Sequence, residues 1–122
     1  MTLQMYDRGF RKLIAWREAH ALTVFMYRIT ANFPKNEMYG LTSQLRRASS
    51  STKAQIAEGS RMSTAPHRKS YYERSYASNA EVDSFAELAK DLGYIDIPTY
   101  KILLDHINRL GFLIHKLIES CT

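Results

Sequence analysis

The chain has 122 residues, of which 45% are hydrophobic and 24% charged, and its formal net charge is +5. This composition is typical of a soluble globular protein, and the length suits a single domain spanning 1–122. No apolar run approaches the roughly 20 residues that a membrane-spanning helix needs, and the first residues lack the apolar core of a signal peptide. The single cysteine, Cys121, excludes a framework of intrachain disulfides. We therefore expect a cytoplasmic protein with no membrane partner.

Periodicity predicts four helices, over residues 10–32, 38–58, 65–92 and 97–120, after a loose lead-in of about nine residues. The first helix has these inward positions at helical spacing: Ile14, Ala21, Leu22, Phe25 and Ile29. Pro34 ends it, because the residue before a proline avoids the α region. Gly59 is expected to be the left-handed cap at the C-terminal end of the second helix.

The third and fourth helices carry clear start and stop signals. Ser63 or Thr64 can cap the third helix, Gly93 ends it, and Asp96 caps the fourth. The inward positions are Tyr72, Tyr76, Asn79, Val82, Phe85 or Ala86, Ala89 and Leu92 in the third helix, and Tyr100, Leu103, Leu104, Ile107, Leu110, Ile114, Leu117 and Ile118 in the fourth. Four such helices joined by short turns predict an all-α, antiparallel up-down-up-down four-helix bundle.

The second helix is unusual because it has small residues on two opposed faces. One face carries Leu41, Leu45, Ala48, Thr52, Ile56 and Gly59; the other carries Ser43, Ser50, Ala54 and Ala57. Small residues opposite a core face either tolerate solvent or let another helix approach closely, and both alternatives are open. We expect the second, with Ser50, Ala54, Ala57 and Glu58 at an interface between copies of the chain in a homo-oligomer.

Positive charge is concentrated between residues 42 and 74, whereas residues 81–96 are mainly acidic. The basic residues are Arg46, Arg47, Lys53, Arg61, Arg68, Lys69 and Arg74. With Tyr71 and Tyr72 nearby, they mix cationic and aromatic groups as surfaces that bind single-stranded nucleic acid do. The alternatives are a solvated charged face with core tyrosines, and basic and acidic regions that pair between copies.

No pattern indicates catalysis or a metal site. The histidines, His20, His67, His106 and His115, lack the spacing of metal ligands, and the serines at 49–51 lack a glycine elbow. The acids Glu58, Glu81 and Asp83 have Arg46, Arg47 and Arg61 as candidate partners, so we expect structural ion pairs or helix caps. We therefore expect no enzyme, no cofactor and no small-molecule substrate.

Three segments together resemble a known family. Phe33-Pro34 with Glu37, the run from Tyr39 to Ala48 (YGLTSQLRRA), and residues 56–59 (IAEG) resemble the bacterial 23S rRNA intervening-sequence proteins. The resemblance extends over nearly the whole chain. Thr52-Lys53 and Gln55 stand where that family usually has isoleucine-proline and asparagine, and Ser78-Asn79 replaces a usual glycine-serine.

The resemblance implies a ring of five four-helix bundles of unsettled role. The family is similar in fold to the accessory protein of diversity-generating retroelements, which binds nucleic acid and a reverse transcriptase. We accordingly expect a non-enzymatic homo-oligomer that binds RNA or DNA through its basic residues. The alternative is a protein-interaction scaffold without nucleic acid, in which the charges serve subunit assembly.

Overall fold

The computed structural model describes residues 9–122, so most of the predicted lead-in lies outside the described residues. The elements are η2 (Phe10–Lys12), α1 (Ile14–Thr30), η3 (Lys35–Glu37), α2 (Leu41–Ser60), α3 (Ala65–Asp91) and α4 (Ile97–Glu119). Within that range there is no strand, and no helix is long and apolar enough to cross a membrane. The all-α prediction with four long helices is therefore confirmed.

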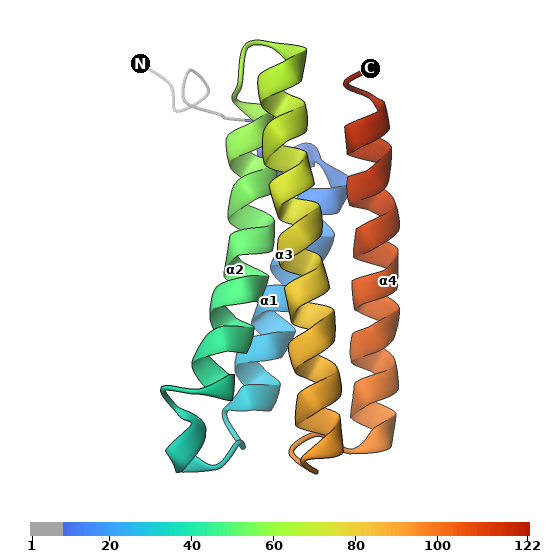
Figure 1. Ribbon diagram of the computed structural model, residues 1–122. Coiled ribbons are helices and arrows are strands. Elements are labelled where there is room, and N and C mark those ends of the chain that lie inside the picture. Colours follow the sequence, from blue (N-terminus) through green and yellow to red (C-terminus); the bar gives the residue numbers. More distant parts are fainter. Residues whose placement is uncertain (1–8) are drawn as a thin grey trace, which may run out of the picture.

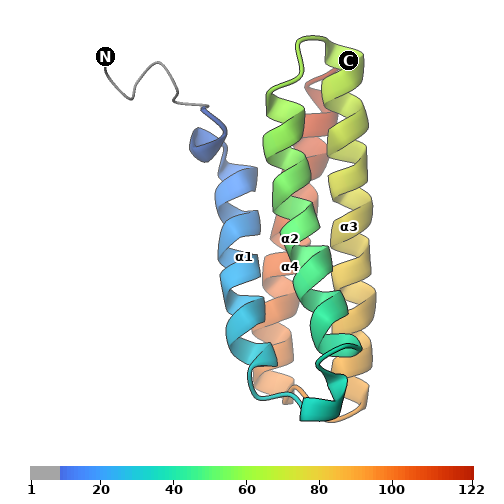
Figure 2. The same ribbon diagram turned by 90° about the vertical axis from the view of Figure 1, so that its left-hand side faces the viewer.

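The four helices pack side by side as a bundle (Figure 1). α1 contacts α2 and α4, α2 contacts α3, and α3 contacts α4. The colours run along one helix and return along the next, so the chain turns back after each helix (Figure 2). The turn between α2 and α3 lies at the same end of the bundle as the C-terminal end of α4.

The first two helices begin later than predicted, for local reasons. The chain forms a short 3-10 helix at Phe10–Lys12 and then an extended residue, Leu13, before α1 starts. α2 starts at Leu41 because Gly40 has a non-helical backbone and the Glu37 carboxylate accepts a hydrogen bond from the Leu41 N–H at 3.1 Å. An N-terminal acceptor of this kind satisfies one of the donors that every helix start leaves without a partner.

Gly59 is not the predicted left-handed cap. It lies inside α2, and a Cβ at this position would come within 2.8 Å of the Tyr72 ring. Its role is therefore to let α3 approach α2 closely. The other predicted signals are confirmed: Gly93 has φ of 80°, Thr64 caps α3, and Asp96 caps α4 through a 2.8 Å bond from the Thr99 N–H.

The predicted inward face is confirmed in α2 and largely in α4, but wrong in part of α1. The whole predicted stripe of α2 is buried, and so are Leu103, Ile107, Leu110 and Ile114 in α4. In α1, Ile14 is 57% exposed and Ala21 is also exposed; the core residues are Ala15, Ala19, Leu22 and Met26. Tyr76 of α3 and Leu92, which directly follows α3, are half-exposed rather than inward.

Buried hydroxyl and amide groups join each consecutive pair of helices. The Thr23 hydroxyl donates to the Ser49 carbonyl at 3.1 Å, and the Ser75 hydroxyl donates to the Thr52 carbonyl at 2.7 Å. The Asn79 amide donates to the Ile107 carbonyl at 3.0 Å. Small side chains with internal partners allow the backbones to approach, which explains why α1 turns Ala19 and Thr23 inward instead of Ile14. The same hydrogen bonds explain how a helix as polar as α2 packs in the core.

Candidate nucleic-acid interface

The seven basic residues nominated from the sequence do not form one continuous patch. They fall into three groups, according to the side of α2 on which they lie and their position along the bundle. Arg46 and Lys53 face α1, and Arg47 faces α3. The remaining four, Arg61, Arg68, Lys69 and Arg74, lie at the end of the bundle where α2 turns into α3.

Arg46 is held against the C-terminal half of α1. Its Nε donates to the Thr30 hydroxyl at 2.9 Å, and its Nη2 donates to the Tyr27 carbonyl at 3.4 Å. The guanidinium carbon lies 4.6 Å from the centroid of the Tyr27 ring, within the range of a cation–π contact. Arg46 is therefore ordered in advance of any ligand, which lowers the entropy lost on binding.

Lys53 forms a second aromatic–cationic group on the same seam. Its Nζ lies 2.9 Å from Nδ1 of His20 and 5.4 Å from the centroid of the Trp16 ring. The Trp16 and His20 rings are stacked at 5.0 Å. The seam between α1 and α2 thus presents positive charge beside aromatic rings at two levels.

Arg47 pairs with Glu81 across α2 and α3 at 2.7 Å and also donates to Gln44. Both charged side chains are about half-exposed, so the pair contributes little to stability. The expectation of structural ion pairs is confirmed for Glu81. Glu58 and Asp83 form no ion pair with any residue in 9–122.

The basic group at the α2–α3 end has no acidic partner within residues 9–122. Arg68 donates to the Met62 carbonyl at 3.1 Å, and Arg74 lies 4.8 Å from the centroid of the Tyr71 ring. Over the same range, the side chains of Arg61 and Lys69 make neither a hydrogen bond nor an ion pair. This group therefore carries positive charge that the described part of the chain does not neutralise.

Tyr72 belongs to the core and cannot stack on a base. Only 4% of it is exposed, and burial raises the pKa of its phenol above the usual 10.0. The core alternative thus holds for Tyr72, whereas Tyr71 remains partly exposed beneath Arg74.

The outer face of α2 is not covered by the other helices. Ala54 and Glu58 are exposed, and Ser50 and Ala57 are half-buried. The predicted interface between copies uses this face and stays a prediction.

Sequence reasoning missed a surface at the N-terminal end of α2. A cavity of about 370 Å³ is lined there by Tyr27, Tyr39, Thr42, Arg46 and Arg47, among others. Tyr39 is 96% exposed. The available signal was the pair Tyr39-Gly40 ahead of two arginines, but the sequence alone does not place Tyr27 of α1 beside them.

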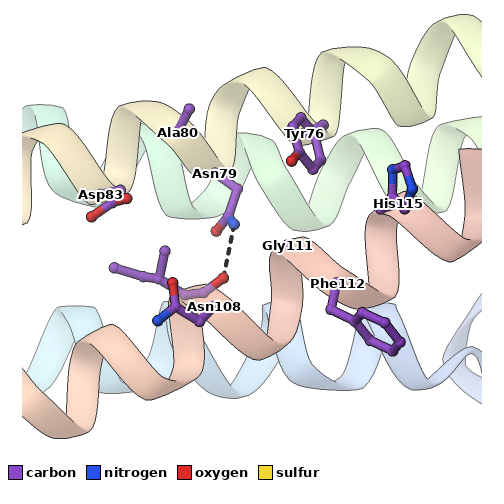
Figure 3. A pocket seen from close by; sticks show the side chains of 9 residues that line it. Tyr76, Asn79, Ala80, Asp83, Asn108, Gly111, Phe112 and His115 are labelled. Carbon is purple, nitrogen blue, oxygen red and sulfur yellow. Dashed lines mark hydrogen bonds between the residues drawn. The ribbon is translucent and has the colours of Figure 1, made fainter.

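A second hollow, of about 420 Å³, lies between α3 and α4 (Figure 3). Asn79 points across it toward α4, and Asp83, Phe112 and His115 lie around it. The ring centroid of His115 lies 6.5 Å from that of Tyr76 on this side of the bundle. The His106 ring contacts Phe25 of α1 instead, so the two histidines lie between different pairs of helices. Among residues 9–122, no three histidine, cysteine or acidic side chains are grouped as metal ligands.

Two comparisons relate the chain to known proteins. Residues 11–116 match the model of a family described as 23S rRNA-intervening sequence protein. The fold is similar to that of a protein of unknown function from the S23 ribosomal protein family of Bacteroides thetaiotaomicron. That match has a TM-score of 0.78 at 16% identity and covers 86% of this chain and 98% of the other. Among curated proteins, none matches the chain.

Proposed function

The chain belongs to the 23S rRNA-intervening sequence protein family, and we propose that it is a non-enzymatic, cytoplasmic, homo-oligomeric bundle that binds RNA or DNA through its basic surface. The oligomer would be a pentameric ring, as the family resemblance implies. Its outer α2 face would lie against a neighbouring copy.

One observation supports nucleic-acid binding most directly. Of the nominated basic residues, only Arg47 has an acidic partner within residues 9–122. Positive charge without an internal counterion is available to phosphate groups, and phosphate binding releases the condensed counterions of the nucleic acid. Because these side chains lie on the outside of helices rather than in a groove-reading arrangement, binding would be largely independent of sequence.

The test is filter binding of single-stranded RNA to the purified protein at several salt concentrations. Affinity should fall steeply between about 50 and about 200 mM salt. Lys69→Glu should weaken binding and reduce the salt slope by about one or more, because it removes a phosphate contact. Lys101→Glu is the matched control: it is the same substitution at an exposed α4 lysine that has no partner within residues 9–122. Absence of binding at low salt would overturn the proposal.

The uncovered outer face of α2 favours a second candidate, a protein-interaction scaffold. In that case basic and acidic regions pair between copies, and Arg46→Glu with Arg47→Glu would dissociate the oligomer. Size-exclusion chromatography with light scattering and absorbance at 260 nm reports assembly and bound nucleic acid together. A double variant that stays assembled but loses nucleic acid supports the first candidate; one that dissociates, in a protein free of nucleic acid, supports the scaffold.

A further inference from the structure

The seam between α1 and α2 carries the same kind of side-chain pair twice. Tyr27 of α1 lies beside Arg46 of α2, and His20 of α1 lies beside Lys53 of α2. In each helix the two positions are seven residues apart, which places them on one face at a separation of about 10 Å. Because the chain turns back between α1 and α2 (Figure 2), the first pair lies toward one end of the seam and the second toward the other.

At the first position, the Tyr27 ring has a cation fixed against it. The Arg46 guanidinium carbon lies 4.6 Å from the ring centroid, and the Arg46 Nε donates to the Thr30 hydroxyl at 2.9 Å. Tyr27 is nevertheless 47% exposed. A half-exposed ring that is held in place is a surface on which an unpaired base can stack, and the adjoining guanidinium can bind a phosphate.

At the second position, the His20 ring is the exposed layer of a stack. It lies on the Trp16 ring with centroids 5.0 Å apart, and Phe10 packs edge-on against Trp16 at 5.1 Å. His20 is exposed, whereas Trp16 is half-buried. Lysine can only donate hydrogen bonds, so His20 Nδ1 accepts in its 2.9 Å contact with Lys53 Nζ, and the ring is neutral. His20 is therefore a fixed aromatic platform with a positive charge at its edge.

Neither helix brings an acidic side chain to this seam. The acid of α1, Glu18, lies on the α4 side, 3.4 Å from Arg109. The acid of α2, Glu58, lies about 140° around the helix from Lys53. Arg46 and Lys53 form no ion pair with any residue in 9–122. Both charges are therefore available to an anionic ligand.

We propose that the α1–α2 seam binds a single strand of nucleic acid. One unpaired base stacks on Tyr27 and another on His20, and phosphates of the same strand contact Arg46 and Lys53. At about 3.4 Å per stacked nucleotide, the two rings are about three nucleotides apart. This inference rests on the proposed nucleic-acid binding and assigns the strand to the seam instead of the basic group at the α2–α3 end.

The chain contains a readout for binding at this place. Trp16 is the single tryptophan of the chain, and it supports the His20 ring, so a strand bound at the seam should change its fluorescence. Anisotropy of a labelled single-stranded RNA reports binding anywhere on the protein, and Trp16 emission in the same titration reports binding at the seam. Single-stranded DNA of the same sequence should give both signals, because no contact of the proposed site requires a 2′-hydroxyl.

The first variant removes both rings and keeps both cations. His20→Ala combined with Tyr27→Ala should weaken single-strand binding by at least about fivefold for each lost stack. Binding of a duplex of the same length should be unchanged, because its paired bases offer no free face to the rings. Tyr76→Ala combined with His115→Ala is the matched control: it removes a tyrosine and a histidine whose rings lie 6.5 Å apart on the α3–α4 side, and it should bind normally.

The second variant tests the phosphate half of the site. Arg46→Gln combined with Lys53→Gln removes two phosphate contacts. The slope of log affinity against log salt for a single strand should therefore become shallower by about 1.4. Lys101→Gln, at an exposed lysine of α4, should leave the slope unchanged. Circular dichroism checks that each variant keeps its helices.

The outcomes separate the seam from the general proposal. If RNA binds without a change in Trp16 emission, and binding is weakened by Lys69→Glu but not by removal of the two rings, the seam is wrong and nucleic-acid binding stands. If no nucleic acid binds at low salt, both are wrong. If the variant without the two rings forms a smaller assembly in light scattering and binds as much RNA per chain, the seam is a contact between copies and the inference is overturned.

Discussion

Gly59 and Gly111 both lie inside helices, yet replacing each with alanine should change stability in opposite directions. A Cβ at Gly59 would lie 2.8 Å from the Tyr72 ring and 3.0 Å from the Tyr71 Cβ. Among residues 9–122, a Cβ at Gly111 would meet only the Asn79 Nδ2, at 3.4 Å. The same substitution therefore meets a rigid neighbour at one position and an ordinary contact at the other.

The magnitudes follow from two competing effects. Alanine is favoured over glycine inside a helix by up to about 1 kcal/mol. At Gly111 no close contact opposes this gain, so the free energy of unfolding should rise by about 0.5–1 kcal/mol. At Gly59 the Tyr72 ring is buried and cannot move away, and overpacking costs about 1–3 kcal/mol. Once the gain from alanine is subtracted, Gly59→Ala should lower the free energy of unfolding by up to about 2 kcal/mol.

Urea unfolding followed by circular dichroism measures both changes, at equal protein concentration because assembly would affect apparent stability. Tyr72→Leu shortens the side chain opposite Gly59, so the alanine should cost less in that background than in the unaltered protein. Gly59→Ala variants as stable as Gly111→Ala variants would refute the close packing of α2 on Tyr72 as the reason for the glycine.

Three further predictions concern the helix ends and the core. Glu37→Ala removes the acceptor of the Leu41 N–H and should lower the free energy of unfolding by about 1–2 kcal/mol in urea; an unchanged midpoint would contradict the capping role. Hydrogen bonds from Thr99 hold the pKa of Asp96 below its usual 3.8, so its stabilisation is present above that value and lost as pH falls through the folded-state pKa. Asp96→Asn keeps an acceptor, and its melting temperature should fall less than that of the unaltered protein between about pH 5 and about pH 2. Leu110→Ala, at a fully buried position, should cost about 2–5 kcal/mol, against almost nothing for Ile102→Ala at a half-exposed one.

Local signals in the sequence determined much of the fold. The α2 stripe from Leu41 to Gly59 and the apolar seam of α4 repeat at helical spacing, and their buried faces follow from that period alone. The caps at Thr64 and Asp96 and the turn at Gly93 depend only on residues within a few positions of one another. The sequence also located the positive charge in α2 and the start of α3.

Tertiary structure decided which face of α1 is buried and how the basic residues are shared. The helical pattern allows either Ile14 or Ala19 to face the core. Because α2 packs close to α1, the smaller residue, Ala19, is buried and Ile14 is exposed. Arg46 and Arg47 are adjacent in sequence but point to different neighbouring helices. Of the two, only Arg47 has an acidic partner within residues 9–122.

The cavity at the N-terminal end of α2 shows the same division. The sequence contains Tyr39, Thr42 and Arg46 within one short segment. Spacing predicts neither the exposure of Tyr39 nor that the Thr42 hydroxyl is without a partner among residues 9–122. Tyr27 reaches this surface only because α1 packs beside α2. Local propensity sets where a helix begins and which face is apolar; contacts between helices set which polar groups are satisfied and which remain available to a ligand.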